Sequence, residues 1–189
     1  MKRRDTLTLA AAGIGTLASP RALAKAAANG GPRVLRGSFP VAETGFDPAQ
    51  VSDIYSRIIT ANIFEALYGY DHLARPAKIV PVIAEAMPEV ADEWREYTVR
   101  IKPGIFFADD PAFKGQRREL VAQDYVYSIM RFADPATKSP LFSTVQNWGI
   151  VGLDERRQQV IDGKKPFDYD TPLEGLRALD RTTLRFRLK

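Results

Sequence analysis

The spacing of apolar residues switches between two periods along the chain, and this switching restricts its fold more than any other feature. Residues 97–101 and 183–189 alternate apolar and polar side chains, which is the two-residue period of a half-buried strand. Residues 52–68 and 122–132 instead place apolar side chains at helical spacing. Strands and helices that follow one another in this way predict an α/β fold, with a mixed α+β arrangement of layers.

The helix predicted at residues 52–68 is the most clearly delimited element. Its apolar residues fall on two faces, which is typical of a helix packed between two layers. Ser52 or Asp53 can cap its first turn by accepting a hydrogen bond from a backbone N–H, and Gly69 can take the left-handed position at its end.

Shorter segments are predicted from turn residues and local alternation. We expect a strand at residues 34–39 that ends at Pro40, and a strand at 105–107 that returns after a type II turn at Pro103-Gly104. Aromatic side chains that follow the strand and helix periods are expected in the core, namely Trp94, Tyr97, Phe106, Phe107, Tyr125 and Tyr127.

Residues 1–24 contain the three parts of an export signal. Residues 2–4 are basic, residues 7–18 are apolar, and residues 22–24 supply the small side chains that a signal peptidase requires. The apolar stretch is well short of the roughly 20 residues that cross a bilayer, which disfavours a permanent membrane anchor. We therefore expect cleavage before Lys25 and a periplasmic location.

The route of export stays open. Arg3-Arg4 followed by Leu7 resembles a twin-arginine signal, whereas Thr6 stands where that motif usually has a large apolar residue. A Sec signal also begins with basic residues, so both routes are kept as alternatives.

Most of the basic excess belongs to the signal. The chain has 27 basic and 23 acidic side chains, and residues 1–24 hold four of the basic and one of the acidic ones, which leaves a net charge of about +1. This balance argues against a nucleic-acid partner. The pairs Arg117-Arg118 and Arg156-Arg157 are accordingly expected on a solvated surface.

No residue pattern predicts catalysis, a metal site or a cofactor. The chain has no cysteine, which excludes disulfides and thiolate chemistry, so an exported protein of this kind depends on a large hydrophobic core. Its single histidine, His72, is expected in a surface loop, and no Gly-x-Ser-x-Gly elbow presents a serine to it. Asp109-Asp110 is expected to be part of a charged loop, because adjacent side chains in extended backbone point apart.

A series of short stretches then occurs in a defined order, at residues 46–48, 81–87, 94–101, 102–107, 124–131, 134–140 and 179–184. In this order they resemble the family 5 extracellular solute-binding proteins of ABC importers, which include dipeptide, oligopeptide and nickel binders. The resemblance runs from about Arg33 to Lys189.

The resemblance implies a periplasmic binding protein-like fold of which only the N-terminal part is present, with the second lobe absent. Residues 25–32 are expected to form a flexible tether, residues 33–63 the start of the first lobe, and residues 64–189 a smaller subdomain attached to it. Because the sequence ends within a predicted strand at 183–189, we expect a truncated frame whose last strand lacks cover and favours association.

The chain departs from the family pattern at three places. Residues 110–119 form an insertion, expected to be an exposed loop, where most members make a short turn. Val121 replaces the usual helix-capping threonine, so the helix at 122–132 must obtain its first hydrogen bonds elsewhere. Leu141 stands where oligopeptide binders often have tyrosine.

The implied function is that of a solute-binding subunit, monomeric when full length, which carries a small solute such as a peptide to an ABC permease in the inner membrane. By resemblance, the residues that face the ligand are Ser52, Asp53, Ile54, Leu141 and Phe142. Two alternatives stay open. One is an exported interaction or sensor module with the same fold, and the other is an exported hydrolase, which would need a nucleophile and base that are not evident here.

Overall fold

The computed structural model describes residues 34, 36–163 and 165–189 of the 189-residue chain. The chain divides into two units, Met1–Ser38 and Phe39–Lys189, and all helices and strands of the described residues lie in the second. The predicted signal at 1–24 and tether at 25–32 lie outside the described residues. The predicted domain boundary between residues 63 and 64 stays a prediction.

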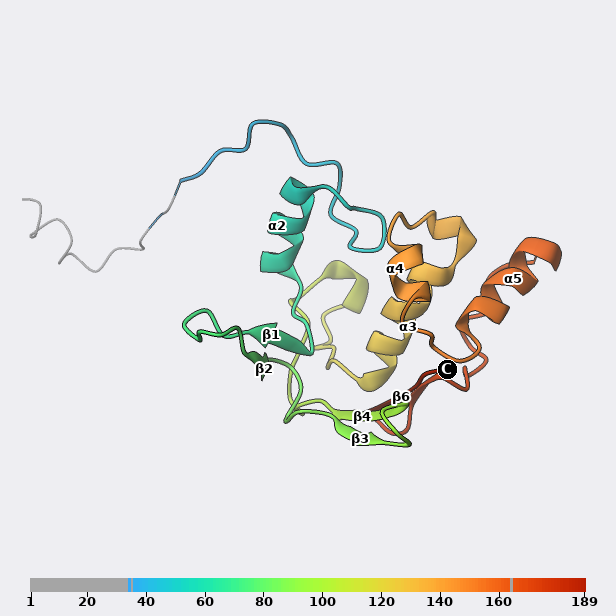
Figure 1. Cartoon of the computed structure of the whole chain (residues 1–189). Helices are drawn as coiled ribbons and strands as arrows, with labels where there is room; N and C mark the ends of the chain where they lie inside the picture. Colours follow the sequence, from blue (N-terminus) through green and yellow to red (C-terminus); the bar gives the residue numbers. More distant parts are fainter. Residues whose placement is uncertain (1–33, 35, 164) are drawn as a thin grey trace, which may run out of the picture. The chain divides into compact units, whose positions relative to one another are not determined.

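A four-stranded antiparallel sheet organises the second unit (Figure 1). Its strand order is β3-β4-β6-β5, with β3 at Glu89–Ala91, β4 at Glu96–Arg100, β5 at Leu176–Ala178 and β6 at Thr183–Arg187. Val99 of β4 stands opposite Leu184 of β6. A separate antiparallel pair is formed by β1, Tyr68–Tyr70, and β2, Ile79–Pro81.

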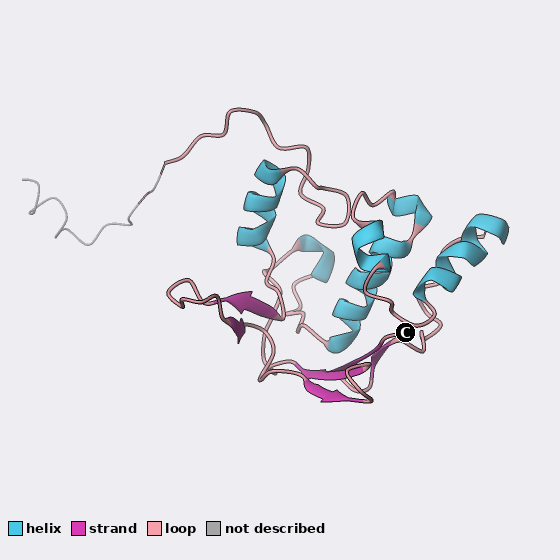
Figure 2. Ribbon diagram, in the orientation of Figure 1, coloured by secondary structure: helices cyan, strands magenta, loops and turns pink. Residues whose placement is uncertain are grey.

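The helices are α2 (Ile54–Ile63), α3 (Ala122–Ala133), α4 (Phe142–Gln146) and α5 (Leu153–Gly163), with single 3-10 turns η1 (Pro111–Phe113) and η2 (Pro135–Thr137). Figure 2 shows α3, α4 and α5 on one side of the four-stranded sheet. None of the helices in residues 36–163 and 165–189 combines the length and the hydropathy that crossing a membrane requires.

Helix α3 carries the main contact between the helices and the sheet. Its buried residues Ala122, Val126, Met130 and Ala133 recur at helical spacing, so they form one stripe along the helix. This stripe packs in one core with residues of the sheet and of α4 and α5, among them Val99, Ile101, Val145, Leu153, Leu176 and Leu184. The mixed α/β arrangement predicted from the two apolar periods is confirmed.

The elements with the clearest period are found where they were expected. Strands at 97–101 and 183–189 correspond to β4 and β6, and the helix at 122–132 corresponds to α3. The expectation of an uncovered last strand is wrong, because β6 pairs with β4 on one side and with β5 on the other, and Leu184 is fully buried.

The first helix is shorter and less covered than predicted. Asp53 is its N-cap as expected, but α2 ends at Ile63 because Phe64 has extended backbone, and Gly69 lies within β1 instead of closing the helix. The prediction that both apolar faces of this helix are buried is also wrong. Ile54 and Ile58 are exposed, whereas the small polar residues Ser56 and Thr60 are buried.

The predicted strand at 34–39 is absent from the described residues 36–39, where Phe39 is exposed and no described strand offers a partner. Residues 105–107 do not return along β4. They pair with residues 118–120, since the Phe107 N–H donates to the Arg118 carbonyl at 2.9 Å and the Leu120 N–H to the Ile105 carbonyl at 2.8 Å.

Several aromatic side chains lie outside the core, although the period of the sequence predicted them inside it. Trp94 is 71% exposed because it lies in the turn between β3 and β4, where its φ is 70°. Tyr127, Phe106 and Phe107 are also exposed, and only Tyr97 and Tyr125 of the predicted set are half-buried. His72 is exposed, as expected for a surface loop.

The predicted solvated arginine pairs have specific contacts. Arg156 is only 12% exposed and donates to the Asp168 carbonyl, while Arg157 donates to the Ala133 carbonyl at 2.9 Å. Arginine thus tethers α5 to the end of α3 and to the loop at Asp168 through carbonyl oxygens. Charge pattern alone does not indicate this use of its several N–H donors.

Candidate functional site

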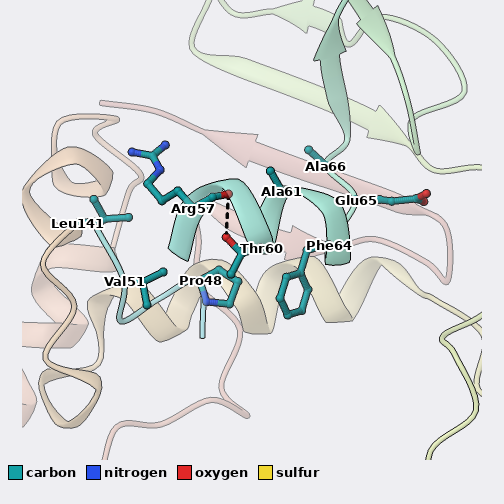
Figure 3. A pocket seen from close by; sticks show the side chains of 9 residues that line it. All are labelled: Pro48, Val51, Arg57, Thr60, Ala61, Phe64, Glu65, Ala66 and Leu141. Atoms are coloured by element: carbon teal, nitrogen blue, oxygen red, sulfur yellow. Dashed lines mark hydrogen bonds between the residues drawn. The ribbon is translucent and has the colours of Figure 1, made fainter. Parts of the chain in front are cut away.

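A hollow of about 280 Å³ lies between α2, the turn that precedes it and the start of α4 (Figure 3). We call it the α2 hollow. Its lining is mostly apolar and consists of Pro48, Val51, Arg57, Thr60, Ala61, Phe64, Glu65, Ala66 and Leu141. Such a volume matches one side chain or a small group more closely than a whole drug-sized ligand.

One wall of the α2 hollow is a tight turn that begins at Asp47. The Asp47 carbonyl accepts the N–H groups of Gln50 and Val51 at 2.9 and 3.2 Å, which folds Pro48 and Val51 toward α2. The Asp47 carboxylate also accepts the N–H of Ala49 at 3.1 Å. Proline at the second position of such a turn needs no N–H donor and is pre-set in φ, so the Asp-Pro pair suits this geometry.

The turn is attached to α3 by a bidentate ion pair. Both guanidinium N–H groups of Arg131 reach the Asp47 carboxylate, at 2.9 and 2.6 Å. The hydrogen bond from Arg131 lowers the pKa of Asp47 below its usual 3.8, so the pair is fully charged at neutral pH. A fork-to-fork pair fixes direction as well as distance, and it therefore sets where Pro48 and Val51 stand relative to the core.

Ser52, Asp53 and Ile54, predicted to face a ligand, lie at the first turn of α2. The Asp53 carboxylate accepts the Ser56 N–H at 2.8 Å and the Thr44 hydroxyl at 2.5 Å. These hydrogen bonds lower its pKa to about 2. Asp53 is thereby committed to capping the helix, and Ser52 and Ile54 are exposed beside it without lining the α2 hollow.

The other two predicted residues, Leu141 and Phe142, lie in different surroundings. Leu141 lines the α2 hollow, where it precedes α4 and lies near Val51 in Figure 3. Phe142 points into another environment, because the guanidinium of Arg157 stacks 4.1 Å from its ring centre and the ring packs against the core. Of the five predicted residues, Leu141 alone contributes to the α2 hollow.

Sequence reasoning did not single out the α2 residues that line this hollow, chiefly Arg57, Ala61 and Phe64. In the sequence, Arg57 is one charged residue and Ala61 and Phe64 are apolar residues of the helix predicted at 52–68. Nothing else in the sequence marks them as part of a site. Thr60 donates its hydroxyl to the Arg57 carbonyl at 3.2 Å, so its polar group is satisfied within the helix. The Glu65 side chain points away from the other lining residues in Figure 3.

The arrangement is suited to binding. Its walls are apolar, and the Arg57 guanidinium supplies a cation on the exposed side. Among the described residues, no cluster of three or more carboxylate or imidazole groups is placed to hold a metal ion. The chemistry that the α2 hollow supports is the burial of an apolar group with an anionic group close to Arg57.

Comparison with known proteins gives a consistent result. The model of bacterial extracellular solute-binding proteins, family 5, middle region, matches residues 78–189, which is more than half of the chain. The chain is 32% identical over 142 residues to the periplasmic oligopeptide-binding protein OppA of Escherichia coli K12, covering 75% of this chain and 22% of that protein.

Solved structures agree in fold. The Escherichia coli murein tripeptide binding protein MppA is 29% identical with a TM-score of 0.55, covering 77% of this chain and 25% of that one. The peptide-binding pheromone receptor PrgZ is 27% identical with a TM-score of 0.53, covering 76% and 24%. The chain therefore spans about a quarter or less of the length of these relatives.

The relatives are binding proteins and a receptor, which supports the expectation that this chain is not an enzyme. The matched region contains β2 to β6 together with α3, α4 and α5, and thus the whole four-stranded sheet. On the extent of this match, the chain belongs to the bacterial extracellular solute-binding proteins of family 5.

Proposed function

We propose that this chain is part of the extracytoplasmic solute-binding subunit of an ABC transporter, which captures a peptide or a related small solute and delivers it to a membrane permease. The proposal places the protein in the periplasm, exported by the signal at residues 1–24. Binding and release need no bond to be made or broken, which is consistent with a chain whose relatives are binding proteins.

The observation that carries the proposal is the α2 hollow. It joins the turn at Pro48–Val51 to Leu141, which is far away in the sequence, and it is open to solvent beside Arg57. We propose that this hollow receives part of the solute. Leu141 offers no hydrogen-bond donor at this wall, so the contact made here is an apolar one.

The test is calorimetric titration of the full-length protein that carries this chain with defined di-, tri- and tetrapeptides. Leu141→Lys puts a charge into the α2 hollow and is expected to weaken peptide binding at least tenfold, since burying an unpaired ammonium is costly. Leu73→Lys is the matched control, because Leu73 is 90% exposed and lies outside the hollow.

Absence of peptide binding, or equal binding by Leu141→Lys and the unchanged protein, would contradict the proposal. Uptake assays in a strain that lacks the gene separate transport from sensing. Restored uptake that depends on the permease supports the transporter subunit. Peptide binding without any effect on uptake favours an exported receptor, the role that PrgZ has by name.

A further inference from the structure

A second and larger hollow also borders the end of α2. We call it the aromatic hollow. Its volume is about 590 Å³, within the range of roughly 300–1,000 Å³ of small-molecule sites. Its lining comes mainly from the end of α2, the segment around residues 105–113 and one face of α3, with Ile83 and Leu120 beside them. It includes Phe64, Ile105, Phe106, Phe107, Phe113 and Tyr125.

The wall of the hollow formed by Phe106 and Phe107 is held in place by two arginines of the 110–119 insertion. Arg118 forms an ion pair with Asp124 of α3, and its guanidinium stacks 4.6 Å from the ring centre of Phe107. Arg117 stacks 3.9 Å from the ring centre of Phe106. Together with the backbone pairing of 105–107 with 118–120, these contacts hold Phe106 and Phe107 at the hollow instead of leaving them in a loose loop.

The charged groups that line the aromatic hollow are all acidic. They are Glu65, Asp110 and Asp124, and among the described residues no lysine or arginine belongs to the lining. Asp124 is neutralised by Arg118, and Asp110 accepts the Ala112 N–H at 2.8 Å in capping η1. Within the described part of the chain, Glu65 forms no ion pair.

Tyr125 also lines the aromatic hollow and contributes a hydroxyl group to it. Burial raises its pKa to about 12, helped by the negative charges of Glu65 and Asp124, so the phenol stays protonated at neutral pH. The hollow thus combines aromatic walls and a neutral hydroxyl with two carboxylates, Glu65 and Asp110, that form no ion pair among the described residues, and of these only Asp110 is engaged in capping a 3-10 turn. Aromatic faces and a carboxylate both attract a cation, and the walls favour an apolar body attached to it.

We propose that the aromatic hollow binds a small organic cation with an aromatic or apolar body, its ammonium group against Glu65 and its body between the phenylalanines of the 105–113 segment and α3. This site is separate from the α2 hollow, although Phe64 and Glu65 border both. This proposal does not depend on peptide binding, so a negative peptide titration would not contradict it.

The probe is 2-phenylethylamine, titrated calorimetrically into the full-length protein. The matched neutral and anionic probes are 2-phenylethanol and 3-phenylpropanoate. The amine is expected to bind with saturation, at least tenfold more tightly than the alcohol, and the carboxylate is expected not to bind. Equal binding of the amine and the alcohol overturns the proposal, and so does the absence of saturable amine binding.

Variants assign the site. Glu65→Gln is expected to weaken amine binding about tenfold, the loss expected for one charge-assisted contact. Glu85→Gln, an exposed carboxylate outside both hollows, is the control and is expected to change nothing. Ser128 is exposed and lines only the aromatic hollow, so Ser128→Phe is expected to abolish amine binding by filling it.

Leu141→Ala, a neutral change at a residue that lines only the α2 hollow, is expected to leave amine binding unchanged. Circular dichroism melts confirm that each variant is folded. Amine binding that survives in folded Ser128→Phe, or that is lost in folded Leu141→Ala, shows that the amine binds elsewhere and overturns the assignment.

Discussion

At the scale of single residues, the ion pair between Asp47 and Arg131 connects the proposed ligand site to the core. Each side chain is 30% exposed, so the pair is neither fully solvated nor deeply buried. Its bidentate geometry distinguishes it from the pair of Arg187 and Glu174, whose side chains are about half exposed at 47% and 58%. Exposed pairs of the latter kind contribute little to stability.

Arg131→Met is therefore expected to lower the free energy of unfolding by about 1–2 kcal/mol at pH 7. The Asp47 carboxylate would stay partly buried but would lose the guanidinium that neutralises it. Urea unfolding of the full-length protein measures this. Glu174→Gln is the control and is expected to change stability by less than about 0.5 kcal/mol. Equal effects of the two variants would show that the Asp47 pair has no special weight.

The same pair predicts a pH dependence with a definite sign. The pKa of Asp47 is lowered in the folded protein below its usual 3.8, so its contribution to stability is complete above that value and is lost as pH falls through the folded pKa. The stability deficit of Arg131→Met is expected to be constant from pH 7 to about 5 and to shrink below pH 3.8.

Gly175 occupies a second critical position. A Cβ atom there would lie 2.4 Å from the Val151 nitrogen and 2.7 Å from the Arg187 carbonyl oxygen, both of them backbone atoms that cannot rotate away. Gly175→Ala is expected to cost about 3 kcal/mol or more, through forced separation of β6 from the segment at residue 151. Gly163→Ala, where the nearest atoms lie at 3.8 Å, is the control in thermal unfolding.

At the scale of elements, the helices and strands that could be predicted are those whose apolar residues recur regularly over enough positions to show a period. Strands β4 and β6 and helix α3 have five to twelve residues, enough to display an apolar period in the sequence, and all three were predicted. Strand β5 has three residues, too few to display a period. Helix α5 has one buried residue, Leu153, in a mostly polar sequence, so it lacks the apolar stripe on which helix prediction depends.

The proposed ligand site was less predictable for a different reason. Leu141 was predicted through family resemblance, whereas Arg57, Ala61 and Phe64 line the same hollow as Leu141 only in the folded chain, where the turn at Asp47 is attached to α3. That attachment joins residues 84 positions apart in the sequence. Local spacing cannot indicate such a contact, because it reports only which face of an element is apolar.

The start of α3 shows how a missing cap is replaced. Val121 stands at the N-cap and cannot accept a hydrogen bond through its side chain. Asp124 instead accepts the Val121 N–H at 2.9 Å, and the Ala122 N–H donates to the Arg181 carbonyl at 2.8 Å. The expectation that this helix obtains its first hydrogen bonds elsewhere is thus confirmed.

Val121→Thr is expected to raise the free energy of unfolding by about 0.5–1 kcal/mol, because a hydroxyl at the N-cap can accept the Asp124 N–H, which now bonds only to the Val121 carbonyl. Val121→Ala, which adds no acceptor, is the matched control and is expected to be neutral or destabilising. Thermal unfolding compares the three proteins. An unchanged or lowered midpoint for Val121→Thr would show that Asp124 already satisfies this end of the helix.

At the scale of the whole molecule, the proposed export signal predicts where the mature chain begins. Periplasmic protein is expected to start at Lys25 on N-terminal sequencing, because the basic, apolar and small-residue parts of the signal occupy residues 1–24. Replacing Arg3 and Arg4 by lysine separates the routes, since loss of export indicates the twin-arginine route and retained export the Sec route. Cytoplasmic protein that retains Met1 would refute export.

The pairing of β4 with β6 has a consequence for synthesis on the ribosome. Val99 meets Leu184 only after the intervening residues have been translated, which takes roughly 4–17 s at about 5–20 residues per second. During this interval β4, with Val99, has no β6 to pair with, and the apolar Ile101 that follows it also awaits its core neighbours. A nascent chain of this protein is therefore expected to need chaperones that hold exposed apolar segments until β6 emerges.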